Sequence, residues 1–148
     1  MKTLLAVLYN HFEFLYLDPR YRITDSRTDG AATNDASLRL TGPVTSFWFG
    51  NDRGQVFCSV APTKSDSTSN WFYIPLVRQY LAGSDETTIL PVAETAVWIR
   101  DNLSRIEALF TDESVDDSCE AMSALREAMA DKYFGPEPPC RDLLGPAH

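Results

Sequence analysis

Hydrophobic spacing divides this chain into a helical start, a β-rich middle and a helical second half. The segment 3–17 lacks glycine and proline, and its apolar side chains recur at helical spacing over a broad stripe. A helix that is apolar around so much of its circumference packs on two sides. We therefore expect a buried N-terminal helix.

Alternating patterns and turn residues predict four β-strands after this helix. The four runs are residues 21–25, 37–41, 44–49 and 55–60. The clearest turn is Asn51-Asp52-Arg53-Gly54, since asparagine at the first position and glycine at the fourth favour a type I turn that closes a hairpin. A polar loop at 62–70 then leads out of the sheet.

The length of that hairpin loop decides which side chains share a face. A three-residue loop places Trp48 on the face of Val56, opposite Phe57. A two- or four-residue loop places Trp48 beside Phe57, with Phe47 and Phe49 on the face of Val56. Both registers leave aromatic side chains on both faces. Either helices cover both faces, or one face offers an aromatic surface to a partner.

Three further helices are expected in the second half. The first has proline in its first turn, at Pro75, and ends at Gly83. The second starts at Pro91 and repeats apolar residues at intervals of 4, 3, 4, 3 and 4. The third spans 115–133 and stops at Gly135. The fold class is therefore α+β: an N-terminal helix, a four-stranded antiparallel sheet, then three helices packed on the sheet.

Length and composition fit one domain. The chain has 148 residues and is 44% hydrophobic, which suffices for one core. We assign residues 1–135 to this domain and 136–148 to an extended, proline-rich tail. The apolar run at 4–9 breaks at Asn10-His11, and no run reaches the ~18 apolar residues of a membrane span. We expect a cytoplasmic protein with no membrane association.

The cysteines agree with a reducing compartment. Cys58, Cys119 and Cys140 are odd in number and lack C-x-x-C spacing. We expect Cys58 and Cys119 to be small buried apolar residues. A bridge between Cys119 and Cys140 is the alternative.

All of the surplus charge lies in the second half. Residues 1–74 hold 7 basic and 7 acidic side chains, whereas residues 75–148 hold 6 basic and 14 acidic ones, which accounts for the net charge of −8. No one-signed basic patch can be assembled, so nucleic-acid binding is disfavoured. The densest acidic group is the predicted partner-binding site, and it attracts a basic protein: Asp112, Glu113, Asp116, Asp117 and Glu120.

Part of this acidic group has a structural explanation. Asp112 or Ser114 can cap the helix that starts there. Asp116, Asp117 and Glu120 lie near the positive end of the helix dipole. About three of the five charges are explained in this way.

The sequence contains few residues that could act in catalysis. The chain has two histidines, the terminal His148 and His11 within an apolar helix, so every nucleophile–histidine pair would have to use His11. Glu94, Asp101 and Glu107 share one helix, but a solvated helix face carries such carboxylates routinely. We expect no enzyme activity and no catalytic residue.

Metal and cofactor motifs are also missing from the sequence. The string at 25–30 is similar to a calcium loop, but Arg27 and Ala36 stand where oxygen ligands are required. There is no cysteine–histidine cluster and no glycine-rich phosphate loop. We expect neither a metal nor a cofactor.

Seven short segments within residues 20–110 carry a resemblance to a known kind of protein: 21–26, 38–40, 51–57, 60–62, 71–73, 76–77 and 106–110. Through these segments the chain resembles small actinobacterial-type proteins that serve as immunity partners of polymorphic or contact-dependent toxins. It implies a non-catalytic protein that binds and blocks a toxin, and it transfers no binding residues to this chain.

Two functions are therefore expected as alternatives. The first is an inhibitor of a basic toxin, such as a nuclease, that uses its acidic side chains and exposed sheet aromatics. The second is a ligand-binding or enzymatic domain with a pocket between sheet and helices. A deep pocket lined by His11, Tyr21, Trp71 or Tyr73 favours the second, whereas a solid core with a flat acidic surface favours the first.

Overall fold

Antiparallel strands form one sheet in the computed structural model, which describes residues 1–28, 36–84 and 88–134. Within these residues the sheet has five strands, and their order follows the chain, β1-β2-β3-β4-β5. The strands are β1 (Arg22–Thr28), β2 (Ala36–Thr41), β3 (Thr45–Asp52), β4 (Gln55–Pro62) and β5 (Phe72–Tyr73). The predicted α+β class is confirmed. The prediction of four strands missed β5, whose two residues are too few to produce an alternating pattern.

The helices outnumber the prediction because the N-terminal segment is broken. They are α1 (Lys2–His11), α2 (Glu13–Tyr16), α3 (Ile74–Ala82), α4 (Val92–Leu109) and α5 (Val115–Phe134), with 3-10 turns η1 (Thr63–Ser65) and η2 (Thr68–Asn70). Phe12 separates α1 from α2, with φ −116° and ψ 25°. Its ring is fully buried and meets the ring of Phe49 edge-on, at a centroid distance of 4.7 Å. A tertiary contact therefore accompanies the break, and nothing in the local sequence marks it.

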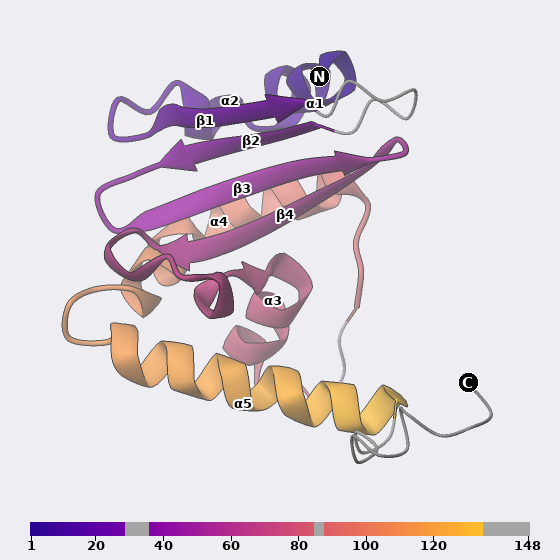
Figure 1. Cartoon of the computed structure of the whole chain (residues 1–148). Coiled ribbons are helices and arrows are strands. Elements are labelled where there is room, and N and C mark those ends of the chain that lie inside the picture. Colours follow the sequence, from indigo (N-terminus) through magenta and orange to yellow (C-terminus); the bar gives the residue numbers. More distant parts are fainter. Residues whose placement is uncertain (29–35, 85–87, 135–148) are drawn as a thin grey trace, which may run out of the picture.

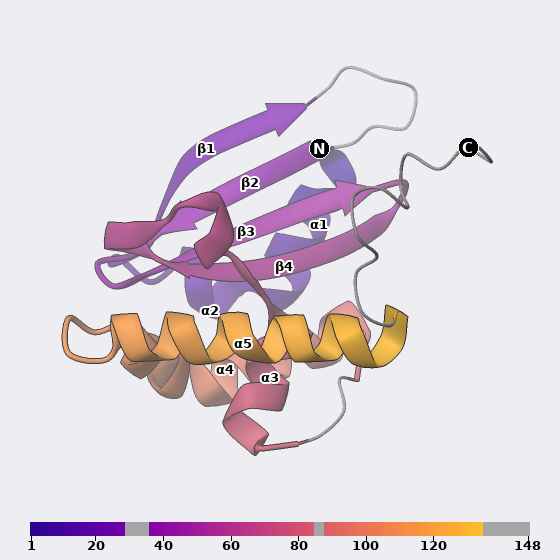
Figure 2. The ribbon, with the colours of Figure 1, turned by 60° about the horizontal axis from the view of Figure 1, so that its bottom comes forward.

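Helices α1, α2 and α4 cover one face of the sheet. Figure 1 shows them behind the strands, with α3 beside β4 and α5 on the far side of α3. Figure 2 shows β1 at the opposite edge, farthest from α5. The covered face carries the core of the sheet, which comprises Ala36, Leu38, Leu40, Phe47, Phe49, Cys58 and Val60.

The hairpin between β3 and β4 has a two-residue loop. Asp52 pairs with Gln55, and both Arg53 (φ 52°) and Gly54 (φ 88°) have positive φ, as a type I′ turn requires. The predicted type I turn was therefore wrong, because Asp52 continues the strand. The register places Trp48 beside Phe57 on the uncovered face, which is the second of the two expected arrangements.

Apolar periodicity placed α3, α4 and α5 correctly. Gly83 ends α3 with φ 66°, and Ile99 and Ile106 of α4 are fully buried. The expectation that all three helices pack on the sheet needs correction, because α5 makes its main contacts with α3 and η2. The stop at Gly135 and the tail 136–148 lie outside the described residues.

None of the described helices is both long and apolar enough to cross a bilayer. Cys58 is buried, as expected, and Cys119 is half-buried; both carry free thiols. Cys140, the partner in the alternative bridge, lies outside the described residues.

Candidate functional site

The predicted acidic residues lie at one end of α5, and all five are exposed. Asp112 and Glu113 precede the helix, whereas Asp116, Asp117 and Glu120 belong to its first two turns. The carboxylate of Asp112 lies 3.0 Å from Nζ of Lys64, and both side chains are at least 74% exposed. An ion pair this exposed is weak. The acidic character of the group therefore persists.

The start of α5 uses main-chain hydrogen bonds. The amides of Ser114 and Val115 donate to the carbonyl of Thr111, at 3.0 and 2.8 Å. Asp112 is one of the two expected caps, but its carboxylate accepts a hydrogen bond from Nζ of Lys64 instead. Asp116 and Asp117 occupy the first turn, where the helix dipole favours negative charge.

The acidic surface extends farther along α5 than the sequence indicated. Glu127 and Asp131 are exposed, while Ser118 and Met122 are buried on the inward side of the helix. Spacings of seven residues from Glu120 to Glu127 and four from Glu127 to Asp131 keep these acids on one helix face. Glu127 and Asp131 lie outside the densest acidic group and therefore outside the predicted site, and only the inward side of α5 shows that they share its exposed face.

Arg126 does not neutralise this face, because its guanidinium turns inward. Nη1 donates to the carbonyl of Trp71 at 3.0 Å, and Nη2 donates to the carbonyl of Ser69 at 2.8 Å. The guanidinium also lies over the ring of Phe72, 5.0 Å from its centroid. Arg126 thus fastens α5 to the η2 segment and leaves the exposed face of the helix acidic.

The uncovered face of the sheet holds a shallow hollow around Trp48. The indole of Trp48 is 37% exposed and lies over Gly50, where a Cβ atom would overlap the ring. The hollow measures about 410 Å³. It is lined by Arg27, Thr28, Ala36, Ser37, Trp48, Gly50, Asn51, Asp52 and Phe57. Glycine at position 50 lets the indole lie flat on the strand and form one side of this hollow.

The other end of the same face is covered by residues 63–71. Asp66 forms an ion pair with Arg39, whose guanidinium lies 5.3 Å from the ring centroid of Trp71. The indole N–H of Trp71 donates to the carbonyl of Asp66 at 3.1 Å. The predicted polar loop is thus tied down onto the sheet, and Trp71 has a structural role.

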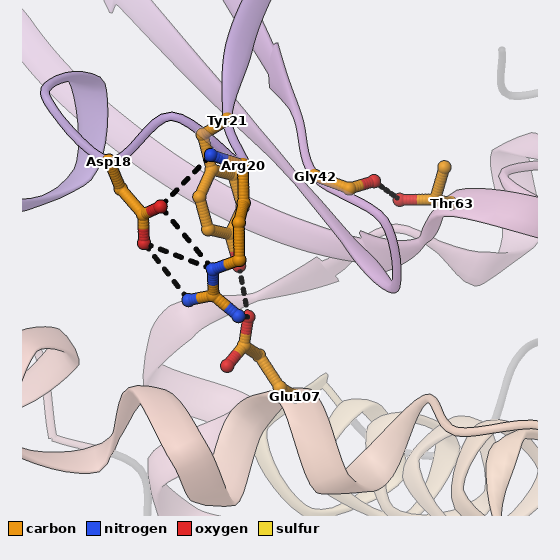
Figure 3. Close-up of polar contacts among 6 residues, drawn as sticks. All are labelled: Asp18, Arg20, Tyr21, Gly42, Thr63 and Glu107. Atoms are coloured by element: carbon orange, nitrogen blue, oxygen red, sulfur yellow. Dashed lines mark hydrogen bonds and ion pairs between the residues drawn. The ribbon is translucent and has the colours of Figure 1, made fainter.

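A polar cluster joins the start of β1 to α4 (Figure 3). The phenol of Tyr21 donates to Oε2 of Glu107 at 2.7 Å, and Nη1 of Arg20 lies 3.2 Å from the same oxygen. Arg20 also pairs with Asp18 at 2.9 Å. Thr63 ties the neighbouring β2–β3 turn by donating to the carbonyl of Gly42 at 2.8 Å.

The pKa shifts in this cluster indicate a structural role, in which hydrogen bonds join the start of β1 to α4. Burial and the hydrogen bond to Glu107 raise the pKa of Tyr21 far above its ordinary range. Hydrogen bonds from Arg20 lower the pKa of Asp18. Glu107, one of the three helix carboxylates considered for acid–base chemistry, is committed to Arg20 and Tyr21. Glu94 and Asp101 are exposed, and Asp101 lies 3.4 Å from Arg100.

An apolar groove lies beside Tyr73, between the β4 strand and the segment before α4. It measures about 440 Å³ and is lined in part by Cys58, Tyr73, Pro75, Ile89 and Val92. Burial raises the pKa of the Cys58 thiol, so the thiol stays protonated at neutral pH. Among the described residues, no three His, Cys, Asp or Glu side chains gather as metal ligands do.

Comparison with protein-family models, with curated proteins and with solved structures finds no match to this chain.

Proposed function

We propose that this protein is a non-catalytic binding module, and most concretely an immunity or inhibitor protein that binds and neutralises a basic toxin such as a nuclease. The proposal rests on surfaces rather than on reactive groups. The odd number of cysteines and the lack of C-x-x-C spacing support a cytoplasmic location.

The exposed face of α5 is the observation that carries the proposal. Seven acids, Asp112 to Asp131, lie at or along this helix, and Arg126 is turned away from them. Lys132 is exposed in the last turn of α5, so the charge of this surface is predominantly rather than wholly negative. A predominantly negative surface speeds the association of a basic protein by about 10–10³-fold.

The uncovered sheet face adds an apolar contribution. Tryptophan is enriched among the residues that contribute most to binding in protein interfaces, and Gly50 leaves room for the exposed Trp48 ring to lie over the strand. Figure 1 shows the uncovered face and the length of α5 from the same side. A partner that extends from the uncovered face of the sheet to α5 contacts both the tryptophan and the acids.

The second candidate is a small-ligand-binding domain that uses the groove beside Tyr73. Tyr73 is one of the four side chains expected to line such a pocket, and the groove has the size of a ligand site. Tyr21 and Trp71, by contrast, donate hydrogen bonds to Glu107 and to the carbonyl of Asp66.

The test is capture of the protein encoded by the adjacent gene, with affinity measured from low to high salt. We expect affinity to fall steeply with salt, and to fall about tenfold or more for the triple variant Asp116→Asn, Asp117→Asn and Glu120→Gln. The matched control is Glu94→Gln with Asp101→Asn, which removes exposed acids from α4 and leaves binding unchanged. Salt-independent binding, or equal loss in the control, overturns the acidic docking surface.

A further inference from the structure

The edge strand β1 is exposed along its whole length. All seven residues of β1 are exposed, including Ile23, which is 55% exposed. Within the described residues, β1 pairs with β2 and has no neighbour on its other side. Figure 2 shows β1 at the margin of the sheet, away from α3, α4 and α5. A free strand edge of this kind is a template for pairing with another strand.

The register reveals which backbone groups face this free edge. The amide of Gly42 donates to the carbonyl of Thr45, so the even-numbered residues of β2 direct their N–H and C=O groups toward β3. Ser37 and Arg39 therefore direct theirs toward β1. Their partners on β1 are Arg27 and Asp25.

Alternation along β1 then assigns the outward groups. Because Asp25 and Arg27 direct their backbone groups toward β2, Ser26 and Thr28 direct theirs toward the free edge. The N–H and C=O of Ser26 thus lie at the middle of an unpaired edge. An antiparallel partner strand would be received there.

The side chains that flank Ser26 are self-complementary. Asp25 and Arg27 lie on the same face and are 3.0 Å apart within one strand. When two copies of β1 are aligned antiparallel about Ser26, Asp25 of each copy falls opposite Arg27 of the other. Opposite charges in directly facing positions stabilise a strand pair, and registers centred on Asp25 or Arg27 would oppose like charges.

We propose that β1 is a homodimerisation edge. Two copies of this chain pair antiparallel about a two-fold axis through Ser26, and each Ser26 donates its N–H to the C=O of the other. The backbone direction and the charge pattern are independent observations: the first places the N–H and C=O of Ser26 at the free edge, and the second selects the register centred on Ser26. A two-fold interface uses the same patch on both copies, as this one does.

The bulge in β1 limits how far the pairing extends. The register with β2 shifts between Ile23 and Asp25, which bends the strand before the paired segment. The interface is therefore short, and short interfaces dissociate readily. The charges that favour a second copy also disfavour strands that lack the matching pattern.

Sedimentation velocity of the full chain tests this proposal, at concentrations from about 10 µM to about 1 mM, where weak dimers form. We expect a monomer–dimer equilibrium that weakens with salt. Ser26→Pro removes an outward N–H and leaves the ladder to β2 intact, so the variant stays monomeric. Circular dichroism confirms that it is folded.

Charge reversal gives a second test that does not depend on proline. Asp25→Arg and Arg27→Asp each place like charges opposite one another and weaken the dimer about tenfold or more. The double variant restores the pattern in reverse and recovers the dimer. Asp101→Arg, on an exposed residue of α4, is the control with no effect.

Two results overturn the proposal. One is a protein that remains monomeric at the highest concentration, including one whose β1 edge instead captures a strand of another protein. The other is a dimer that withstands both Ser26→Pro and the single charge reversals, because its contact lies elsewhere. Recovery by the double reversal, after loss in both singles, is the outcome that supports β1 pairing.

Discussion

Tyr21 and Glu107 are 86 residues apart in the chain, and the phenol of one donates a 2.7 Å hydrogen bond to the carboxylate of the other. The bond fastens the beginning of the edge strand β1 to α4. The ring of Tyr21 is buried, packs over Gly42 and meets the ring of Phe47 at a centroid distance of 5.7 Å. β1 itself buries no side chain, so this preceding residue is what connects it to the core.

The first prediction is that Tyr21→Phe destabilises the protein by about 1–2 kcal/mol. The variant keeps the buried ring and removes a charge-assisted hydrogen bond to the half-buried Glu107. Urea unfolding monitored by circular dichroism measures the change. Tyr9→Phe is the control, because Tyr9 is 71% exposed, and we expect it to be neutral. Equal stability of the two variants would show that the bond contributes nothing.

The second prediction concerns alkaline pH. The pKa of Tyr21 is raised from its ordinary value of 10.0. The unfolded chain therefore loses this proton at a lower pH than the folded protein does. The contribution of Tyr21 to the free energy of unfolding is fully present below about pH 10 and falls as the pH rises above that value. Cys58 acts in the same direction from its ordinary value of 9.0.

Urea unfolding at a series of pH values between about 8 and 11 checks this dependence. In Tyr21→Phe the decline should be shallower, because one of the groups responsible is gone. Tyr9→Phe should follow the wild-type curve. A wild-type stability that rises across this range would contradict the prediction.

The third prediction is that Arg126→Ala costs about 1–3 kcal/mol. The substitution leaves the carbonyls of Ser69 and Trp71 without their charged donor and removes packing on Phe72. Arg126→Lys should recover part of the loss, since lysine keeps the charge but not the two-pronged geometry. Arg100→Ala is the matched control on an exposed ion pair. A loss in the control as large as in Arg126→Ala would refute the specific role.

The fourth prediction is that Arg53→Asn stabilises the β3–β4 hairpin by about 0.5–1 kcal/mol. Arg53 has a φ of 52°, and asparagine tolerates this left-handed region better than arginine does. Thermal unfolding measures the gain. Arg53→Lys keeps the charge without the conformational benefit and should match the wild type. Gly54→Ala, at φ 88°, should be destabilising.

The β3–β4 hairpin shows how far local patterns reach. Alternation and the Asn51–Gly54 turn residues located both strands, and they left two registers open. The two-residue turn emerged because Asp52 pairs with Gln55, which puts Phe47 and Phe49 under the helices together with Val60. Burial of that apolar set selects the register, and burial depends on helices distant in sequence.

The candidate binding surface was only partly predictable. The five clustered acids stood out by density alone, and all five are exposed. Their extension through Glu127 and Asp131 depends on which side of α5 faces inward, and the inward turn of Arg126 depends on carbonyls of residues 69 and 71. Neither could be derived from composition.

Short-range chemistry accounts for the helices, the strands and the cluster of acids, because apolar period, turn residues and charge act over a few neighbouring positions. The break at Phe12, the short strand β5, the single covered face of the sheet and the Tyr21–Glu107 bond follow from contacts between distant segments. Such contacts form when the core is buried, because the apolar face of each helix or sheet must pack against another element. The surfaces proposed for binding, on α5, around Trp48 and on β1, are those that the closed core leaves exposed.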